Sequence, residues 1–213
     1  MRFSHGRKKS ERRWIRIRIA IVSALAASGL GLTIGMLAVP ASASSLSVRA
    51  PTSSNWPTNG GYYYLQNLDG GSSACLDANL NTLPANGTNV QTWGCNGWGN
   101  QTWIFYSHSN MDTSWFTIQN YDGGQCLDAD ANTLPANGTR VQMWGCNGRG
   151  NQNWWLHAAG YTWNGYPIFT ITSGLVGPCL DGNANTLPAN GTRVQMWACN
   201  GWSNQRWILI PIS

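Results

Sequence analysis

Hydrophobic residues in this chain occur in short runs that are separated by turn-forming residues. Three of these runs are β-branched, aromatic or alternating in polarity, and they lie at residues 62–66, 115–119 and 168–172. Each run has the length of an ordinary strand, and Gly, Asn, Asp and Ser are abundant between them. None of these runs shows the periodicity of an amphipathic helix. The pattern therefore predicts an all-β fold made of short strands.

A unit of 29 residues occurs three times without a gap. The copies run from Cys75 to Trp103, from Cys126 to Trp154 and from Cys179 to Trp207. The second copy differs from the first at six positions, and the third differs from the second at six. Each copy follows one of the three apolar runs, so a full repeat is roughly 50 residues long and holds about four short strands.

The number and regularity of the copies indicate how they are arranged. Open solenoids usually carry unlike end repeats that cover the exposed core, whereas here the third copy is as regular as the second. A closed threefold arrangement needs no such caps. We therefore expect twelve short strands in a small closed barrel-like fold, with repeats at about 61–110, 111–160 and 161–213.

The first 43 residues have the features of an export signal. They hold eight of the thirteen Lys and Arg residues, followed by an uncharged apolar run at 19–39 and the small-residue sequence Ala41-Ser42-Ala43. We expect cleavage after Ala43 and secretion of the remainder. The apolar run is long enough to span a bilayer, so an uncleaved membrane anchor is the alternative. Residues 44–60 are rich in Ser, Thr, Asn and Pro and are expected to form a linker.

The charges of the secreted part exclude several classes of function. Five Arg and seven Asp are present after residue 43, with no Lys and no Glu, so the net charge of +5 belongs to the export signal. No basic face is available to neutralise phosphates, and we expect no binding to nucleic acid. A long Glu- and Lys-rich helix or coiled coil is excluded by the same composition.

Each copy opens with Cys-Leu-Asp and closes with Asn-Gln-x-Trp. The closing motifs are Asn100-Gln101-Thr102-Trp103, Asn151-Gln152-Asn153-Trp154 and Asn204-Gln205-Arg206-Trp207. Together these motifs resemble the ricin B-chain type of lectin and carbohydrate-binding module, and the resemblance covers nearly all of residues 61–213. It implies a β-trefoil fold, the binding of sugars, and a polysaccharide or cell-surface glycan as partner.

All six cysteines lie in the repeats, two in each copy and 20 residues apart. An even number behind an export signal indicates disulfides formed in an oxidising compartment. Fifteen pairings are possible, and pairing within the copies is the one that repeats the symmetry: Cys75 with Cys95, Cys126 with Cys146, and Cys179 with Cys199. Cys-x-x-Cys is absent, and His108 and His157 are the histidines of this part, so we expect no metal and no cofactor.

A sugar ring presents a face of C–H groups and a fringe of hydroxyls, so its site needs an exposed aromatic ring with polar groups at the edge. Every copy supplies such a set, at positions that match the family's sugar-contacting Asp, aromatic residue and Asn, with the closing Gln supporting the Asp. The candidates are Asp77, Trp93, Asn100 and Gln101; Asp128, Trp144, Asn151 and Gln152; and Asp181, Trp197, Asn204 and Gln205. Gln91, Gln142 and Gln195 are candidates for an additional contact.

Structural roles for the same residues remain open at this point. An Asp after a strand can cap a turn, and a Trp two residues before a Cys can point into the core. The carboxylate retained in every copy favours a binding role, because burying a charge for packing alone is costly. The family resemblance implies a core position for the closing tryptophans, Trp103, Trp154 and Trp207.

A Gly-flanked tip lies between the second Cys and the Asn-Gln pair. It carries Trp98, Arg149 or Trp202 in the three copies. These side chains are either solvent-exposed loop residues or an extension of the site towards a second sugar unit, in which case the second copy has a different preference from the others.

Catalysis is not supported by the sequence. A glycosidase needs two carboxylates at a fixed separation, whereas each copy keeps one Asp and the remaining Asp residues have no paired setting. Gly-x-Ser-x-Gly and an obvious partner for either histidine are also absent. We expect a secreted, monomeric, non-catalytic lectin for galactose-like or xylan- and arabinan-type ligands. The alternatives are a trefoil that acts by protein contact and a small glycoside hydrolase.

Overall fold

The structure is a computed structural model that describes residues 56–109, 114–162, 164–174 and 177–212. The expected export signal and most of the expected linker lie outside the described residues. Twelve strands and four single-turn 3-10 helices form the regular structure of the described part, which confirms the all-β prediction. None of its helices has the length and apolar character needed to cross a membrane.

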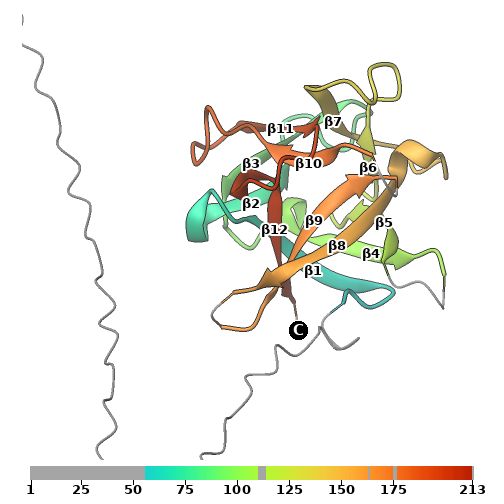
Figure 1. Ribbon diagram of the computed structural model, residues 1–213. Coiled ribbons are helices and arrows are strands. Elements are labelled where there is room, and N and C mark those ends of the chain that lie inside the picture. Colours follow the sequence, from blue (N-terminus) through green and yellow to red (C-terminus); the bar gives the residue numbers. More distant parts are fainter. Residues whose placement is uncertain (1–55, 110–113, 163, 175–176, 213) are drawn as a thin grey trace, which may run out of the picture. The chain divides into compact units, whose positions relative to one another are not determined.

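Each repeat contributes four strands, and the three apolar runs become the first strand of each set (Figure 1). The strands are β1 (Gly61–Asn67), β2 (Ala74–Ala78), β3 (Thr88–Gly94) and β4 (Trp103–Ser107); β5 (Trp115–Asn120), β6 (Cys126–Ala129), β7 (Thr139–Trp144) and β8 (Asn153–Tyr161); and β9 (Pro167–Ser173), β10 (Cys179–Gly182), β11 (Thr192–Trp197) and β12 (Arg206–Pro211). The 3-10 helices are η2 (Gly71–Ser73), η3 (Gly99–Gln101), η4 (Gly150–Gln152) and η5 (Ser203–Gln205).

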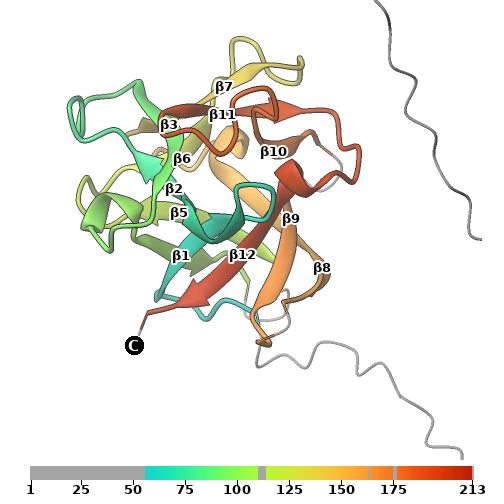
Figure 2. The same cartoon turned by 90° about the vertical axis from the view of Figure 1, so that its left-hand side faces the viewer.

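Six strands close a barrel. Neighbours pair antiparallel around the ring in the order β1, β4, β5, β8, β9 and β12, and β12 returns to β1. The other strands form the hairpins β2–β3, β6–β7 and β10–β11, which gather at one end of the barrel in Figures 1 and 2. Because β3, β7 and β11 also pair with one another, the hairpins meet around a threefold axis. This architecture is the β-trefoil.

The tryptophan that closes each repeat lies in the core. Trp103, Trp154 and Trp207 are fully buried, as the resemblance implied. Each indole Nε1 donates a hydrogen bond to the carbonyl of the Leu in Cys-Leu-Asp: Leu76 at 3.0 Å, Leu127 at 2.9 Å and Leu180 at 2.9 Å. This bond connects the last residue of each 29-residue copy to the strand that carries the repeated Asp, and it satisfies a buried donor and acceptor together.

The three disulfides form within the copies, as the symmetry predicted. They join Cys75 to Cys95, Cys126 to Cys146, and Cys179 to Cys199. Each links the beginning of the first hairpin strand to the residues that follow the second, since Cys75 is paired with Trp93 in the ladder. The disulfide thus fixes the base of the hairpin beside the loop that leads to the Asn-Gln pair.

Asn-Gly turns join each repeat to the next. The side-chain Oδ1 of the Asn accepts a hydrogen bond from a backbone N–H in the following repeat: Asn86 from Gly145 at 2.7 Å, Asn137 from Ala198 at 2.6 Å, and Asn190 from Gly94 at 2.7 Å. The third of these contacts runs from the last repeat to the first and closes the ring. The glycines that follow have φ of +84°, +82° and +80°, a region that favours glycine.

Candidate functional site

In the first repeat, the carboxylate of Asp77 accepts hydrogen bonds from three amide side chains. Gln91 donates to Oδ1 at 2.9 Å, while Asn100 and Gln101 donate to Oδ2 at 2.7 and 3.0 Å. The β2–β3 pairing places Asp77 opposite Gln91, and η3 presents Asn100 and Gln101 from the other side. The side chains predicted for this site are therefore brought together by three separate elements.

The other two repeats reproduce this geometry. Each carboxylate again receives one amide on Oδ1 and two on Oδ2. The distances are 3.1 Å from Gln142, 2.8 Å from Asn151 and 3.0 Å from Gln152 to Asp128, and 3.1 Å from Gln195, 2.7 Å from Asn204 and 3.0 Å from Gln205 to Asp181. The repetition shows that the arrangement follows from the repeated sequence.

The closing Gln supports the site from below. Gln101 is completely buried; its Nε2 also donates to the carbonyl of Gly94 at 3.1 Å, and its Oε1 accepts from the N–H of Asn96 at 2.9 Å. Gln152 and Gln205 make the same bonds. With both polar atoms engaged inside the protein, these residues position the Asp and the loop, and the supporting role implied by the resemblance fits them better than direct ligand contact.

Burial raises the pKa of Asp77 above its ordinary value, and the hydrogen bonds from Gln91, Gln101 and Asn100 partly offset this rise. The pKa values of Asp128 and Asp181 are raised in the same way. Amide side chains are the hydrogen-bond partners of all three carboxylates, and their hydrogen bonds favour the charged form while burial opposes it. A buried carboxylate held this way is a strong acceptor for a ligand hydroxyl.

An exposed tryptophan stands at the edge of every site. Trp93, Trp144 and Trp197 are 41%, 39% and 39% exposed, so the structure supports the outward orientation and not the core alternative. In the first repeat, Trp93, Asp77 and Asn100 line one hollow of about 280 Å³, together with Leu80 and Trp98. The corresponding hollow of the second repeat holds about 160 Å³ and is lined by Asp128, Trp144 and Arg149 among others.

The Asn of the Asn-Gln pair has a free acceptor atom in two of the sites. The Oδ1 atoms of Asn100 and Asn204 are buried and have no hydrogen-bond partner among the described residues. A buried acceptor without a partner is costly.

The second site lacks a hydrogen bond from the neighbouring repeat that holds the Asn of the Asn-Gln pair in the other two sites. Asn120 donates to the carbonyl of Asn100 at 2.9 Å, and Asn67 donates to the carbonyl of Asn204 at 2.9 Å, each from the neighbouring repeat. At the equivalent position of the third repeat the residue is Ser173. Asn151 is correspondingly half-buried, whereas Asn100 and Asn204 are buried. Sequence reasoning missed this support, although the Asn, Asn and Ser at the ends of β1, β5 and β9 carry its signal.

The tips of the three sites share a backbone geometry and differ in side chain. Trp98, Arg149 and Trp202 each have a backbone N–H that donates at 2.9 Å to the Asn two residues earlier. Trp98 and Trp202 are 59% and 65% exposed, and Arg149 is exposed as well. Because the loop is fixed in the same way each time, the side chain itself distinguishes the second site.

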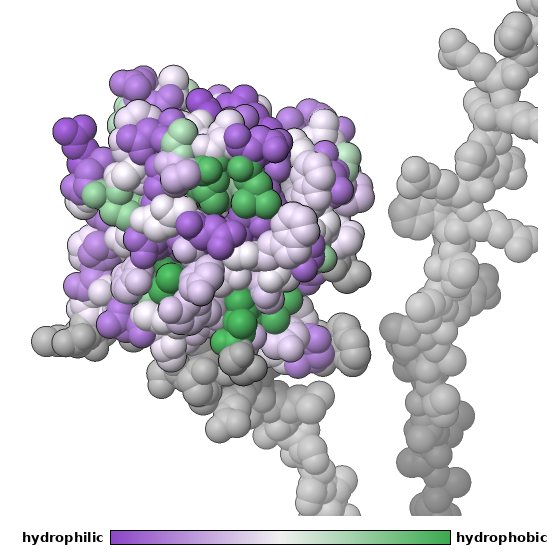
Figure 3. Space-filling model, turned by 180° about the vertical axis from the view of Figure 1, so that it is seen from behind, coloured by the Kyte–Doolittle hydropathy of each residue, from purple (hydrophilic) through white to green (hydrophobic). Residues whose placement is uncertain are grey.

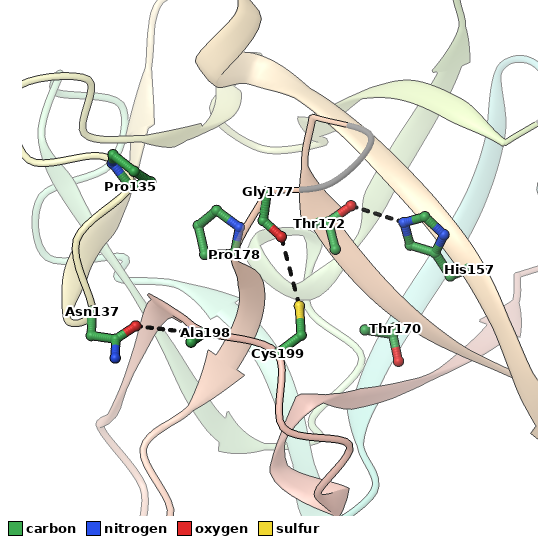
Figure 4. Close-up of a pocket in the computed structure, with 9 residues that line it drawn as sticks. All are labelled: Pro135, Asn137, His157, Thr170, Thr172, Gly177, Pro178, Ala198 and Cys199. Atoms are coloured by element: carbon green, nitrogen blue, oxygen red, sulfur yellow. Dashed lines mark hydrogen bonds between the residues drawn. The ribbon is translucent and has the colours of Figure 1, made fainter.

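A hollow of about 690 Å³ lies away from these sites, between the second and third repeats (Figure 4). His157 faces it, with its Nε2 3.0 Å from the hydroxyl of Thr172, which in turn donates to the carbonyl of Gly174 at 2.7 Å. The imidazole therefore donates through Nε2. No carboxylate lines the hollow, so it lacks the paired acids of a glycosidase.

The face seen from behind is mostly polar. From behind, hydrophilic and neutral residues dominate, and apolar residues form small separate clusters (Figure 3). Within the described ranges, no three His, Cys, Asp or Glu side chains come close enough to hold a metal ion.

Known proteins share the fold of this chain. The family model described as "Ricin-type beta-trefoil lectin domain" matches residues 61–207. The structure is similar to the designed threefold-symmetric protein ThreeFoil, with 24% identity and a TM-score of 0.62 over 71% of this chain and 99% of that one. It is similar to the Rhizoctonia solani agglutinin, with 25% identity and a TM-score of 0.60 over 76% and 100%.

A third similar structure is the ricin B-like lectin of Macrolepiota procera in complex with lactose, with 19% identity and a TM-score of 0.55 over 71% of this chain and 96% of that one. An exo-β-1,3-galactanase from Clostridium thermocellum matches with 24% identity and a TM-score of 0.62, over 74% of this chain and 31% of the enzyme. No curated protein sequence matches this chain significantly.

Proposed function

Because this chain belongs to the family of ricin-type β-trefoil lectin domains, we propose that it is a secreted, non-catalytic protein that binds glycans at three sites. One observation carries the proposal: every repeat combines an exposed Trp with a buried carboxylate that three amides hold in place. The three disulfides fit an extracellular protein. The export signal at residues 1–43 and the linker at 44–60 are part of this proposal.

Binding follows from the chemistry of each hollow. In the first site, the C–H face of a sugar ring packs on Trp93, and a ring hydroxyl donates to the acceptor position of Asp77 that the three amides leave free. A further hydroxyl donates to the unpartnered Oδ1 of Asn100. The corresponding Trp and Asp residues act in the same way in the second and third sites. No step in this scheme breaks a covalent bond, so the protein holds its ligand without changing it.

Each shallow site binds weakly, with a dissociation constant on the order of millimolar or about −4 kcal/mol. Three sites on one rigid trefoil raise the apparent affinity for a branched or repetitive polymer where the spacing allows simultaneous contact. We propose galactose-like sugars or xylan- and arabinan-type polysaccharides as ligands and a monomer as the binding unit.

A glycan array, with insoluble xylan and galactan pull-downs alongside, tests this function. We expect selective retention that one free sugar abolishes. If a folded, disulfide-intact sample binds no glycan, the proposed function is wrong. The exposed Trp98 and Trp202 would then favour the alternative in which the trefoil acts by contact with another protein.

Glycan binding should weaken as the pH falls. Burial raises the pKa of Asp77, Asp128 and Asp181, so these carboxyls take up protons at a higher pH than exposed aspartates do, and a protonated carboxyl is a poorer acceptor. The effect on folding has the opposite sign: a carboxyl with a raised folded-state pKa destabilises the fold while ionised, and this penalty disappears on protonation.

Affinity measured against pH, with near-ultraviolet circular dichroism as the control for folding, checks this expectation. Binding should be lost while the spectrum is still native. Affinity that stays constant until the protein unfolds would contradict a role for these carboxylates.

We propose that the aromatic tips extend the first and third sites to a second sugar unit. A Trp98→Arg change, which copies the tip of the second repeat, should lower the affinity for a disaccharide by about 3–10-fold and leave monosaccharide binding unchanged, as expected for the loss of one aromatic contact of about 0.5–1.5 kcal/mol. Arg149→Trp is the reciprocal variant and should strengthen disaccharide binding at the second site. Isothermal titration calorimetry on variants in which the other two sites are disabled measures the affinity of each site separately. If Trp98→Arg lowers the affinity for the monosaccharide and the disaccharide equally, Trp98 contacts the first sugar unit and not the second.

A further inference from the structure

Two arginines converge on a hollow of about 430 Å³ where β3, β7 and β11 meet. Arg140 and Arg193 line it together with Asn89, Gln91 and Gly191. The strand pairing explains the convergence, since Arg193 lies opposite Gln91 and Arg140 lies opposite Gln195. Arg140, Arg149, Arg193 and Arg206 are the arginines of the described ranges, so half of that positive charge gathers here.

The hydrogen bonds of these arginines hold them in place without neutralising them. Arg140 donates to the carbonyl of Gly87 and to the Oδ1 of Asn89, the latter at 2.7 Å, and Arg193 donates to the carbonyl of Gly138 at 2.6 Å. All three acceptors are neutral oxygens. A guanidinium carries five N–H donors, so both arginines retain donors beyond those used in these contacts.

Two carboxylates are linked to residues that line the hollow, and both make their hydrogen bonds elsewhere. Asp130 is joined to Arg140 through the backbone, but its Oδ1 accepts from the N–H and the side-chain amide of Asn132 at 3.0 and 2.9 Å, and Asp130 lines the hollow of the second sugar site. Asp77 accepts from the Nε2 of Gln91 and from η3. Neither carboxylate lines the arginine hollow.

We propose that this hollow binds an oxyanion: a sulfate, phosphate or carboxylate group. Guanidinium groups bind such groups through paired charge-assisted hydrogen bonds, and both arginines that line this hollow retain N–H donors for an anion. The site does not depend on the sugar sites, although it shares Gln91 with the first of them. An oxyanion carried on a glycan and a free inorganic anion are therefore two sources of the same ligand chemistry.

Titration of the purified protein with sodium sulfate, against sodium chloride at matched ionic strength, tests the site. The side-chain Nε–H resonances of arginine report on it directly. We expect saturable shifts of Arg140 and Arg193 at millimolar sulfate and little change at Arg149 and Arg206. Equal, non-saturating shifts of all four resonances would reflect ionic strength alone and overturn the proposal.

The chain supplies its own matched variants. Arg140→Asn and Arg193→Asn copy Asn89, the residue that the first repeat carries at this position, so the backbone accepts the change. Each should weaken sulfate binding at least tenfold, while Arg206→Asn, which copies Asn153 of the second repeat, should leave it unchanged. Unaltered binding in the double Asn variant would overturn the assignment, and the wild-type resonances decide the question even if that variant does not fold.

Parallel titrations with galactose 6-sulfate, galactose and free sulfate distinguish an anion carried on a glycan from a free inorganic anion. Tighter binding of the sulfated sugar than of either component identifies an anionic glycan, whereas equal binding of sulfated sugar and sulfate identifies a free anion. Failure of galactose to bind affects only the proposed lectin function, because the sulfate arm is read at Arg140 and Arg193. Failure of both anions overturns the oxyanion site.

Discussion

Simultaneous replacement of Trp93, Trp144 and Trp197 by Ala should abolish glycan binding and leave the protein folded. These rings are about two-fifths exposed, so their removal opens no core cavity. Each ring supplies the apolar platform of its site, and the loss of all three platforms removes the stacking contact with the first sugar unit. The expected result is no measurable retention on a glycan that the wild type binds.

A buried tryptophan provides the control for the effect of Trp→Ala on folding. Trp154→Ala removes a fully buried ring and leaves the carbonyl of Leu127 without its donor, so this single change should cost about 3–5 kcal/mol of folding free energy. Thermal melts followed by circular dichroism distinguish the two outcomes. Glycan binding that persists in the folded triple variant would show that the platforms were wrongly assigned.

Reduction of the three disulfides should unfold the protein or lower its melting temperature by tens of degrees. Each bond closes a loop with a sequence separation of 20, which in the chain-entropy description is worth about 3 kcal/mol. Small domains have a total stability of about 5–15 kcal/mol, so the combined loss is comparable to the whole.

Melting curves with and without a phosphine reductant, together with a thiol count, measure this effect. A variant with Cys75→Ala and Cys95→Ala should lose roughly one third of what full reduction removes. A fully reduced chain that melts at the same temperature as the oxidised protein would contradict the prediction.

The sequence predicted the features that every repeat contains within itself. Each apolar run forms a strand, and each pair of cysteines 20 residues apart forms a disulfide. Asp77 accepts hydrogen bonds from Asn100 and Gln101. These outcomes were predictable because the threefold repetition separates what the fold requires from what varies, and because the contacts span a single hairpin and its following turn.

Contacts between repeats could not be predicted in the same way. Asn120 supports the loop of Asn100, and Arg193 lies beside Gln91, yet these pairs belong to different repeats. Their proximity depends on how the hairpins are rotated and offset around the axis, which the pattern within one repeat does not specify. For this reason the weaker support of the second site and the arginine hollow emerged only in three dimensions.

The Asn-Gly contacts make the junction between the last and first repeats equivalent to the two covalently continuous ones. Asn190 reaches Gly94 as Asn86 reaches Gly145, and β12 lies beside β1 with Pro211 opposite Tyr63. The position at which the chain starts is therefore incidental to the architecture. A circular permutant that begins in the second repeat and joins β12 to β1 through a short linker would retain all three interfaces between repeats. The trefoil is therefore a closed ring of equivalent repeats, whichever repeat comes first in the chain.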